Sequence, residues 1–126
     1  MKGKTSEWVS FAANDIIAAN AIINNTSLTG HVAFLCQQAI EKYFKAYLVE
    51  NNKQIRKIHD LIRLYSEVKA IKDWSIDETI LRRIDGIYTE SRYPDDVGML
   101  MPTMEDAKSY LEFAKRIENI FRSLVG

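Results

Sequence analysis

The chain has 126 residues, 47% of them apolar, and its 17 lysines and arginines balance 17 aspartates and glutamates. This size and composition predict one domain over residues 1–126 and argue against a disordered or turn-rich β protein. A single cysteine, Cys36, and two histidines exclude an internal disulfide framework and a Cys/His zinc cluster, so we expect neither a metal nor a cofactor. The apolar runs are too short for a bilayer and no secretory signal is recognisable, so we expect a cytoplasmic protein without a membrane partner.

Hydrophobic residues recur at helical spacing through most of the chain, and no run alternates cleanly enough to indicate a strand. Trp8 and Phe11 are among the apolar positions of the first periodic stretch. Ser75 with Glu78 has the spacing of a capping box at a helix start. We expect five helices, over residues 6–23, 29–50, 60–69, 75–90 and 104–124.

The connections between these helices are short, which makes consecutive helices antiparallel neighbours. The sequence therefore predicts an all-α fold, an up-down antiparallel bundle of four main helices plus one short helix, the third. Thr103 with Asp106 gives the last helix an acidic start similar to that of the fourth. A longer loop over residues 91–102 separates the last two helices, and a loop of that length in so small a domain is more often functional than idle.

The predicted second helix has a broad apolar face that must enter the core, and Cys36 lies on it as a small hydrophobic residue. Its opposite face combines amides and charges with large apolar side chains, which is unusual for a solvated face but normal for a surface that meets another protein. The alternative is an ordinary i, i+4 ion pair between Glu41 and Lys45, worth about 0.2–0.5 kcal/mol. We predict a dimer interface formed by Phe34, Gln37, Gln38, Glu41, Lys45 and Leu48.

Three blocks of the sequence resemble the HEPN domain family. They are QQAIEKYFKAYL over residues 37–48, KIHDL over residues 57–61, and Tyr88 followed by SRYPD over residues 91–95. The first block is the most specific, and all three occur in the family's order and spacing. The resemblance implies an α-helical bundle that usually dimerises and is frequently paired with a minimal nucleotidyltransferase in toxin–antitoxin-like systems. Some members of the family are ribonucleases or are thought to bind nucleotides.

The ribonuclease motif associated with the family is an Arg followed four to six residues later by a His. Such a pair can move a proton and offset charge on a phosphate. The histidines here stand at 31 and 59, and no arginine stands at the required distance before either of them. Lys53 precedes His59 at a permitted distance, but it lacks the planar guanidinium of arginine. We therefore predict a protein that is not catalytic.

A candidate binding site remains around the start of the third helix. His59 and Asp60 stand where free helix N–H groups favour an anion, and Lys57 lies just before them. Arg92 and Tyr93 would supply a bidentate donor for a phosphate and a stacking ring for a base. The alternative is structural: Asp60 or His59 caps the helix, while Arg92 pairs with an acidic side chain and Tyr93 closes the end of the bundle.

Charge is unevenly distributed along the chain. Residues 41–72 carry eight basic and four acidic side chains, whereas residues 73–126 carry seven basic and eleven acidic ones. The basic middle could steer an anionic ligand, or make two copies, or a copy and a partner, electrostatically complementary. Solvated helix faces are the alternative explanation.

The leading hypothesis is a non-catalytic homodimer that binds a nucleotide or a nucleotidyltransferase partner in a toxin–antitoxin-like pair. The alternative is a metal-independent ribonuclease toxin that uses His59 with Arg92 or Lys53, and only this alternative makes RNA a ligand. A third reading is a domain that merely oligomerises and holds another chain in place.

Overall fold

The structure is a computed structural model that describes residues 1–55, 57, 59–91 and 101–126, with only the backbone of residues 87–91. The described residues form five helices and no strand. None of the described helices is both long enough and apolar enough to cross a membrane. The helices are α1 (Gly3–Asn25), α2 (Thr29–Glu50), α3 (Leu61–Ile71), α4 (Glu78–Ser91) and α5 (Met104–Val125).

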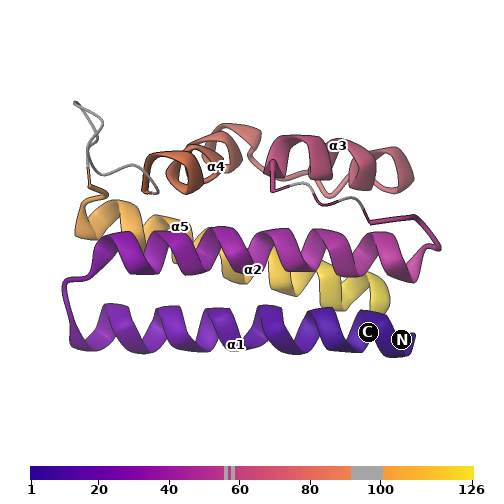
Figure 1. The fold of residues 1–126 in the computed structure, drawn as a ribbon, viewed down its shortest axis with the longest axis horizontal. Helices are drawn as coiled ribbons and strands as arrows, with labels where there is room; N and C mark the ends of the chain where they lie inside the picture. Colours follow the sequence, from indigo (N-terminus) through magenta and orange to yellow (C-terminus); the bar gives the residue numbers. More distant parts are fainter. Residues whose placement is uncertain (56, 58, 92–100) are drawn as a thin grey trace.

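α2 is the central helix of the bundle (Figure 1). α1 runs antiparallel to it on one side, α3 and α4 follow one another on the opposite side, and α5 lies behind it. Because α2 contacts all four other helices, 13 of its 22 residues are buried. The predicted all-α bundle is confirmed, with α3 the shortest helix at 11 residues.

Aromatic side chains of α2 pack against α3 and against Trp74, which follows α3 in the chain. The ring of Phe44 lies 5.5 Å from that of Tyr65 and 5.6 Å from that of Trp74. Tyr47 meets Trp74 edge-on, with ring centroids 5.2 Å apart. Such pairs contribute about 0.5–1.5 kcal/mol each beyond the area that they bury. Cys36 is buried as expected, and this burial raises the pKa of its thiol to about 12, which leaves it a poor nucleophile.

The start of the last helix is as predicted, and that of the fourth is not. Thr103 and Asp106 form a reciprocal capping box at the start of α5. Ser75 caps nothing: its backbone has a φ of 55° and its N–H donates to Asp73. Asp77 takes the capping position instead, since its carboxylate accepts from the N–H of Thr79 at 2.9 Å, so α4 begins at Glu78.

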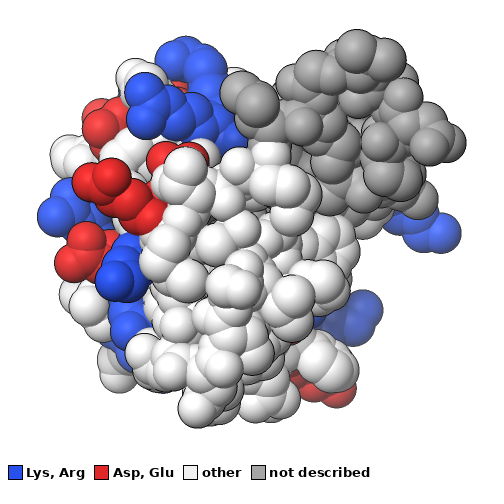
Figure 2. Space-filling view, turned by 90° about the vertical axis from the view of Figure 1, so that its left-hand side faces the viewer, with Lys and Arg blue, Asp and Glu red and all other residues white. Residues whose placement is uncertain are grey.

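Charged side chains are unevenly spread over the molecule. Figure 2 shows the end of the bundle at which α1 passes into α2, where a broad uncharged surface has charged side chains around its rim, most of them on the left of the view. The sequence explains this, because residues 16–40 contain no Lys, Arg, Asp or Glu. The predicted loop over residues 91–102 falls mostly outside the described residues.

Candidate functional site

Most of the predicted interface on α2 is covered by the same chain. Gln37 is 0% exposed, Glu41 4% and Lys45 5%, and Leu48 is also buried. The chain returns along α2 after Glu50, and α3 and α4 then pack on this side (Figure 1). The expectation that these four side chains lie on an outer surface is therefore wrong.

Phe34 and Gln38 are the members of the predicted interface that reach the surface. Phe34 is 37% exposed, and Gln38 is partly buried, with its amide donating to Oε1 of Gln37 at 3.1 Å. Both residues lie in the first half of α2. A dimer contact through them stays a prediction.

The buried carboxylate of Glu41 is the centre of a polar network. Its Oε2 accepts a hydrogen bond from the ammonium of Lys45 at 3.0 Å, and Nδ1 of His59 lies 3.1 Å from its Oε1. The amide of Gln37 donates both to Oε1 of Glu41 and to the backbone oxygen of His59, at 3.4 Å each. A buried charge is tolerated only when it is paired and hydrogen-bonded in this way. The network thus holds His59 against α2 and fixes the side chain of Lys45.

Carboxylates of the chain itself occupy the start of α3. Asp60 accepts from the N–H groups of Ile62 and Arg63 at 2.9 and 3.2 Å, and Asp85 of α4 accepts from that of Leu61 at 2.8 Å. Burial raises the pKa of Asp85, and the charges of Asp60 and Glu41 raise it further, against the opposing Leu61 N–H. The helix-capping alternative for Asp60 is confirmed, and these N–H groups are already satisfied by anions.

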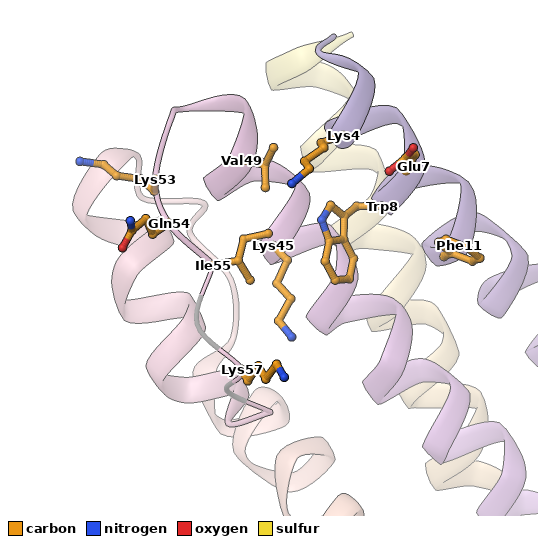
Figure 3. Close-up of a pocket in the computed structure, with 10 residues that line it drawn as sticks. All are labelled: Lys4, Glu7, Trp8, Phe11, Lys45, Val49, Lys53, Gln54, Ile55 and Lys57. Atoms are coloured by element: carbon orange, nitrogen blue, oxygen red, sulfur yellow. The ribbon is translucent and has the colours of Figure 1, made fainter.

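A basic groove of about 830 Å³ runs between the first half of α1 on one side and residues 53–55 and 57 on the other, and Lys45 and Val49 of α2 line it between them (Figure 3). In Figure 3 the ammonium groups of Lys45 and Lys57 point to the same end of the groove and Lys4 points into it, while Lys53 and Gln54 point away. The groove is lined by Lys4, Glu7, Trp8, Phe11, Lys45, Val49, Lys53, Gln54, Ile55 and Lys57.

Two aromatic rings of α1 border this groove, each with a lysine of α2 against it. The Lys45 ammonium lies 5.5 Å from the centre of the Trp8 ring. The Lys42 ammonium lies 5.8 Å from the centre of the Phe11 ring and pairs with Asp15 at 2.6 Å. Phe11, one of the apolar positions of the periodic stretch, is 60% exposed.

The predicted binding residues are therefore dispersed. Lys57 lines the groove, and His59, whose side chain is 52% exposed, sits against Glu41 rather than in the groove lining. Asp60 caps α3. Arg92 and Tyr93 lie outside the described residues. Among the described residues, no group of three or more His, Cys, Asp or Glu side chains could hold a metal ion.

Sequence reasoning missed Lys4, Trp8 and Phe11 as groove residues. One signal for them was available, because positions 4, 8 and 11 follow the helical i, i+4, i+7 spacing and must share a face of α1. No sequence signal indicated that the chain after α2 returns to face them.

The chain is similar to HEPN proteins over nearly its whole length. The HEPN domain model matches residues 5–124. The crystal structure of ST0689, an archaeal HEPN homologue, superposes with a TM-score of 0.74 at 25% identity and covers 100% of both chains. None of the curated proteins compared with the chain matches it. The family suggested by the three sequence blocks is confirmed, and the chain belongs to the HEPN domain family.

Proposed function

We propose that this HEPN protein is a non-catalytic binding module that holds a nucleotide in the basic groove beside Trp8 of α1. The observation that carries the proposal is that Lys4, Lys45, Lys57 and the Trp8 ring line one groove. Ammonium groups complement phosphate oxygens, and an aromatic ring complements a base. One groove thus offers both halves of a nucleotide a partner.

The groove suits a phosphate better than the start of α3 does. The α3 N–H groups already bind Asp60 and Asp85, whose charges repel an anion. Lys4 and Lys57, by contrast, form no ion pair with any residue that the structure describes. Lys45 is fixed by Glu41 before a ligand arrives, so binding costs little of its side-chain entropy.

Calorimetry with ATP tests this proposal. We expect measurable heat, together with a change in tryptophan fluorescence that is lost in Trp8→Phe. Lys57→Ala should weaken binding about tenfold, because it removes a charge-assisted contact. Lys108→Ala is the matched control, since it removes the same charge from an exposed lysine of α5 that does not line the groove. Absence of heat at millimolar ATP, or equal losses in the two lysine variants, would contradict the proposal.

The proposal includes a homodimer that works with a nucleotidyltransferase partner in a toxin–antitoxin-like pair. Phe34 and Gln38, at the surface of α2, support a contact between two copies. The excess of basic side chains in residues 41–72 and of acidic ones in residues 73–126 supports complementary docking of a second chain.

One observation favours a second candidate, a metal-independent ribonuclease. Nδ1 of His59 lies 3.1 Å from the Glu41 carboxylate, which is the arrangement that fixes the orientation of a general acid or base imidazole. The test is incubation of the purified protein with single-stranded RNA, with and without divalent metals. Cleavage that disappears in His59→Ala would replace the binding proposal, and RNA left intact over hours would eliminate this candidate.

A further inference from the structure

The basic groove combines apolar surface with uncompensated positive charge. Trp8 of α1, Val49 of α2 and Ile55 line it, and each of them is partly exposed. Among the described lining residues, one is acidic, Glu7, and four are lysines, namely Lys4, Lys45, Lys53 and Lys57. Lys45 is held by Glu41, but the other three lysines form no ion pair with any residue that the structure describes. The charge available to a partner therefore comes from these three.

One wall of the groove is a stretch of chain whose backbone is unpaired. Residues 53–55 belong to no helix or strand. The N–H and C=O groups of Gln54 and Ile55 form no hydrogen bond with any of the described residues. Ile55 and Lys57 both point into the groove (Figure 3), and side chains two positions apart share a face in an extended chain. Such a wall can take up a second extended segment beside it.

We propose that the groove is the docking surface for an acidic, extended segment of a protein partner. The main chain of this segment pairs with residues 53–55, and its carboxylates accept from the unpaired lysines. Its alternate side chains are aliphatic and pack against Trp8, Val49 and Ile55. A nucleotide uses the lysines and the Trp8 ring, but it has no amide backbone to pair with Gln54 and Ile55.

The charge of the groove selects this partner over other peptides. A basic segment is repelled by the lysines, and a neutral one leaves the ammonium groups of Lys4, Lys53 and Lys57 without a counter-charge. The inference rests on the proposed function in one respect. Because the acidic segment and the nucleotide both need Lys57, they exclude one another, so that a protein partner regulates access to the nucleotide site.

Fluorescence anisotropy with a labelled peptide in which glutamates alternate with leucines tests the proposal. We expect this peptide to bind at least tenfold more tightly than its counterpart with glutamines in place of the glutamates. Lys57→Ala should weaken binding of the acidic peptide about tenfold, because it removes a charge-assisted contact. Lys108→Ala, which removes an exposed lysine of α5 outside the groove, should leave it unchanged. Equal binding of the two peptides, or equal losses in the two variants, would overturn the proposal.

Two methylated peptides separate main-chain pairing from charge alone. One carries methyl groups on the backbone nitrogens of its leucines and the other on those of its glutamates. The N–H groups of alternate residues point to the same edge of an extended chain, so only one of the two sets faces residues 53–55. One methylated peptide should therefore bind at least fivefold more weakly than the parent, and the other should bind like the parent. Equal affinities of the two would overturn the proposal.

Competition with ATP distinguishes failure of this proposal from failure of the proposed function. If both hold, ATP releases the labelled peptide. If ATP binds in calorimetry but does not release the peptide, or if only ATP binds, the docking proposal is overturned and the proposed function stands. If only the peptide binds, the proposed function is refuted and the docking surface stands. Absence of binding by both ligands would refute both.

Discussion

Glu41 determines how the polar side chains beneath the groove are arranged. Its carboxylate accepts from the ammonium of Lys45 and contacts the imidazole of His59, and all three lie between α2 and the returning chain. Lys45 in turn borders the groove and the ring of Trp8. One buried carboxylate thus connects the core to the candidate site.

Glu41→Gln should therefore destabilise the fold strongly. The variant keeps the shape of the side chain but leaves the Lys45 ammonium, 5% exposed, without a counter-charge. Removing one partner of a buried ion pair typically costs about 3–5 kcal/mol. Urea unfolding of the wild type and the variant measures this cost. Glu112→Gln on the exposed face of α5 is the control and should stay within about 0.5 kcal/mol. If Glu41→Gln also lost less than about 0.5 kcal/mol of unfolding free energy, the Glu41–Lys45 ion pair would contribute no more than a surface contact.

At the scale of elements, α3 and α4 are joined through a carboxylate. Asp85 of α4 accepts the N–H of Leu61, one of the free donors at the start of α3. This hydrogen bond fixes the start of α3 against α4. It therefore also positions the residues just before α3, of which Lys57 lines the groove. Its disadvantage is that three acidic side chains, Glu41, Asp60 and Asp85, lie near one another.

Asp85 predicts a pH dependence of stability with a definite sign. Its folded-state pKa lies above the ordinary value of 3.8, chiefly because of burial. Between these two values the folded state binds more protons than the unfolded state, so stability increases as the pH falls through that window. Relative to Asp85→Asn, which cannot titrate, the wild type should therefore gain stability as the pH is lowered from 7 toward 4.

Asp73 provides the opposite case within the same molecule. Hydrogen bonds from the Ser75 N–H and the Tyr65 hydroxyl lower its pKa. Stability from this group is present above pH 3.8 and is lost as the pH falls through the folded value. Urea unfolding of wild type, Asp85→Asn and Asp73→Asn from pH 7 to well below pH 3.8 compares the two groups. Parallel pH profiles for all three proteins would contradict both assignments.

Periodicity and capping patterns were enough to predict the helices but not their surroundings. The predicted bounds of α2, residues 29–50, match the structure, and the start of α5 followed from the capping pair of Thr103 and Asp106. Ser75 fits the same capping pattern, yet Asp77 starts α4, because a local pattern cannot decide between neighbouring capping residues.

The candidate site depended on long-range packing and was therefore harder to predict. Periodicity correctly separated the two faces of α2, but it could not show that α3, α4 and the returning chain cover the polar one. For the same reason the groove beside Trp8 and Phe11 was not foreseen. Lys57 was identified because it lies in a recognisable block, and its groove partners on α1 come from a segment about fifty residues away.

At the scale of the whole molecule, charge is absent from one end. The uncharged surface of Figure 2 lies where α1 passes into α2, and residues 16–40 of that hairpin carry no Lys, Arg, Asp or Glu. Leu28 and Phe34, two residues of the range 16–40, have exposed side chains. Two copies can bring such surfaces together without like-charge repulsion, and uncharged centres with aromatic residues are typical of protein interfaces.

The homodimer that we propose should therefore depend on Phe34. We expect the wild type to have the mass of a dimer at micromolar concentration in light scattering. Phe34→Asp should shift it to a monomer, since it would place two carboxylates in a contact that excludes water. Glu112→Lys, a charge change outside this surface, should leave the mass unchanged. Phe34 is partly exposed and the core beneath it is unaltered, so the variant should keep the wild-type helical content in circular dichroism. A wild type of monomeric mass would rule out the dimer, and a dimeric Phe34→Asp would move the contact to another face of the bundle.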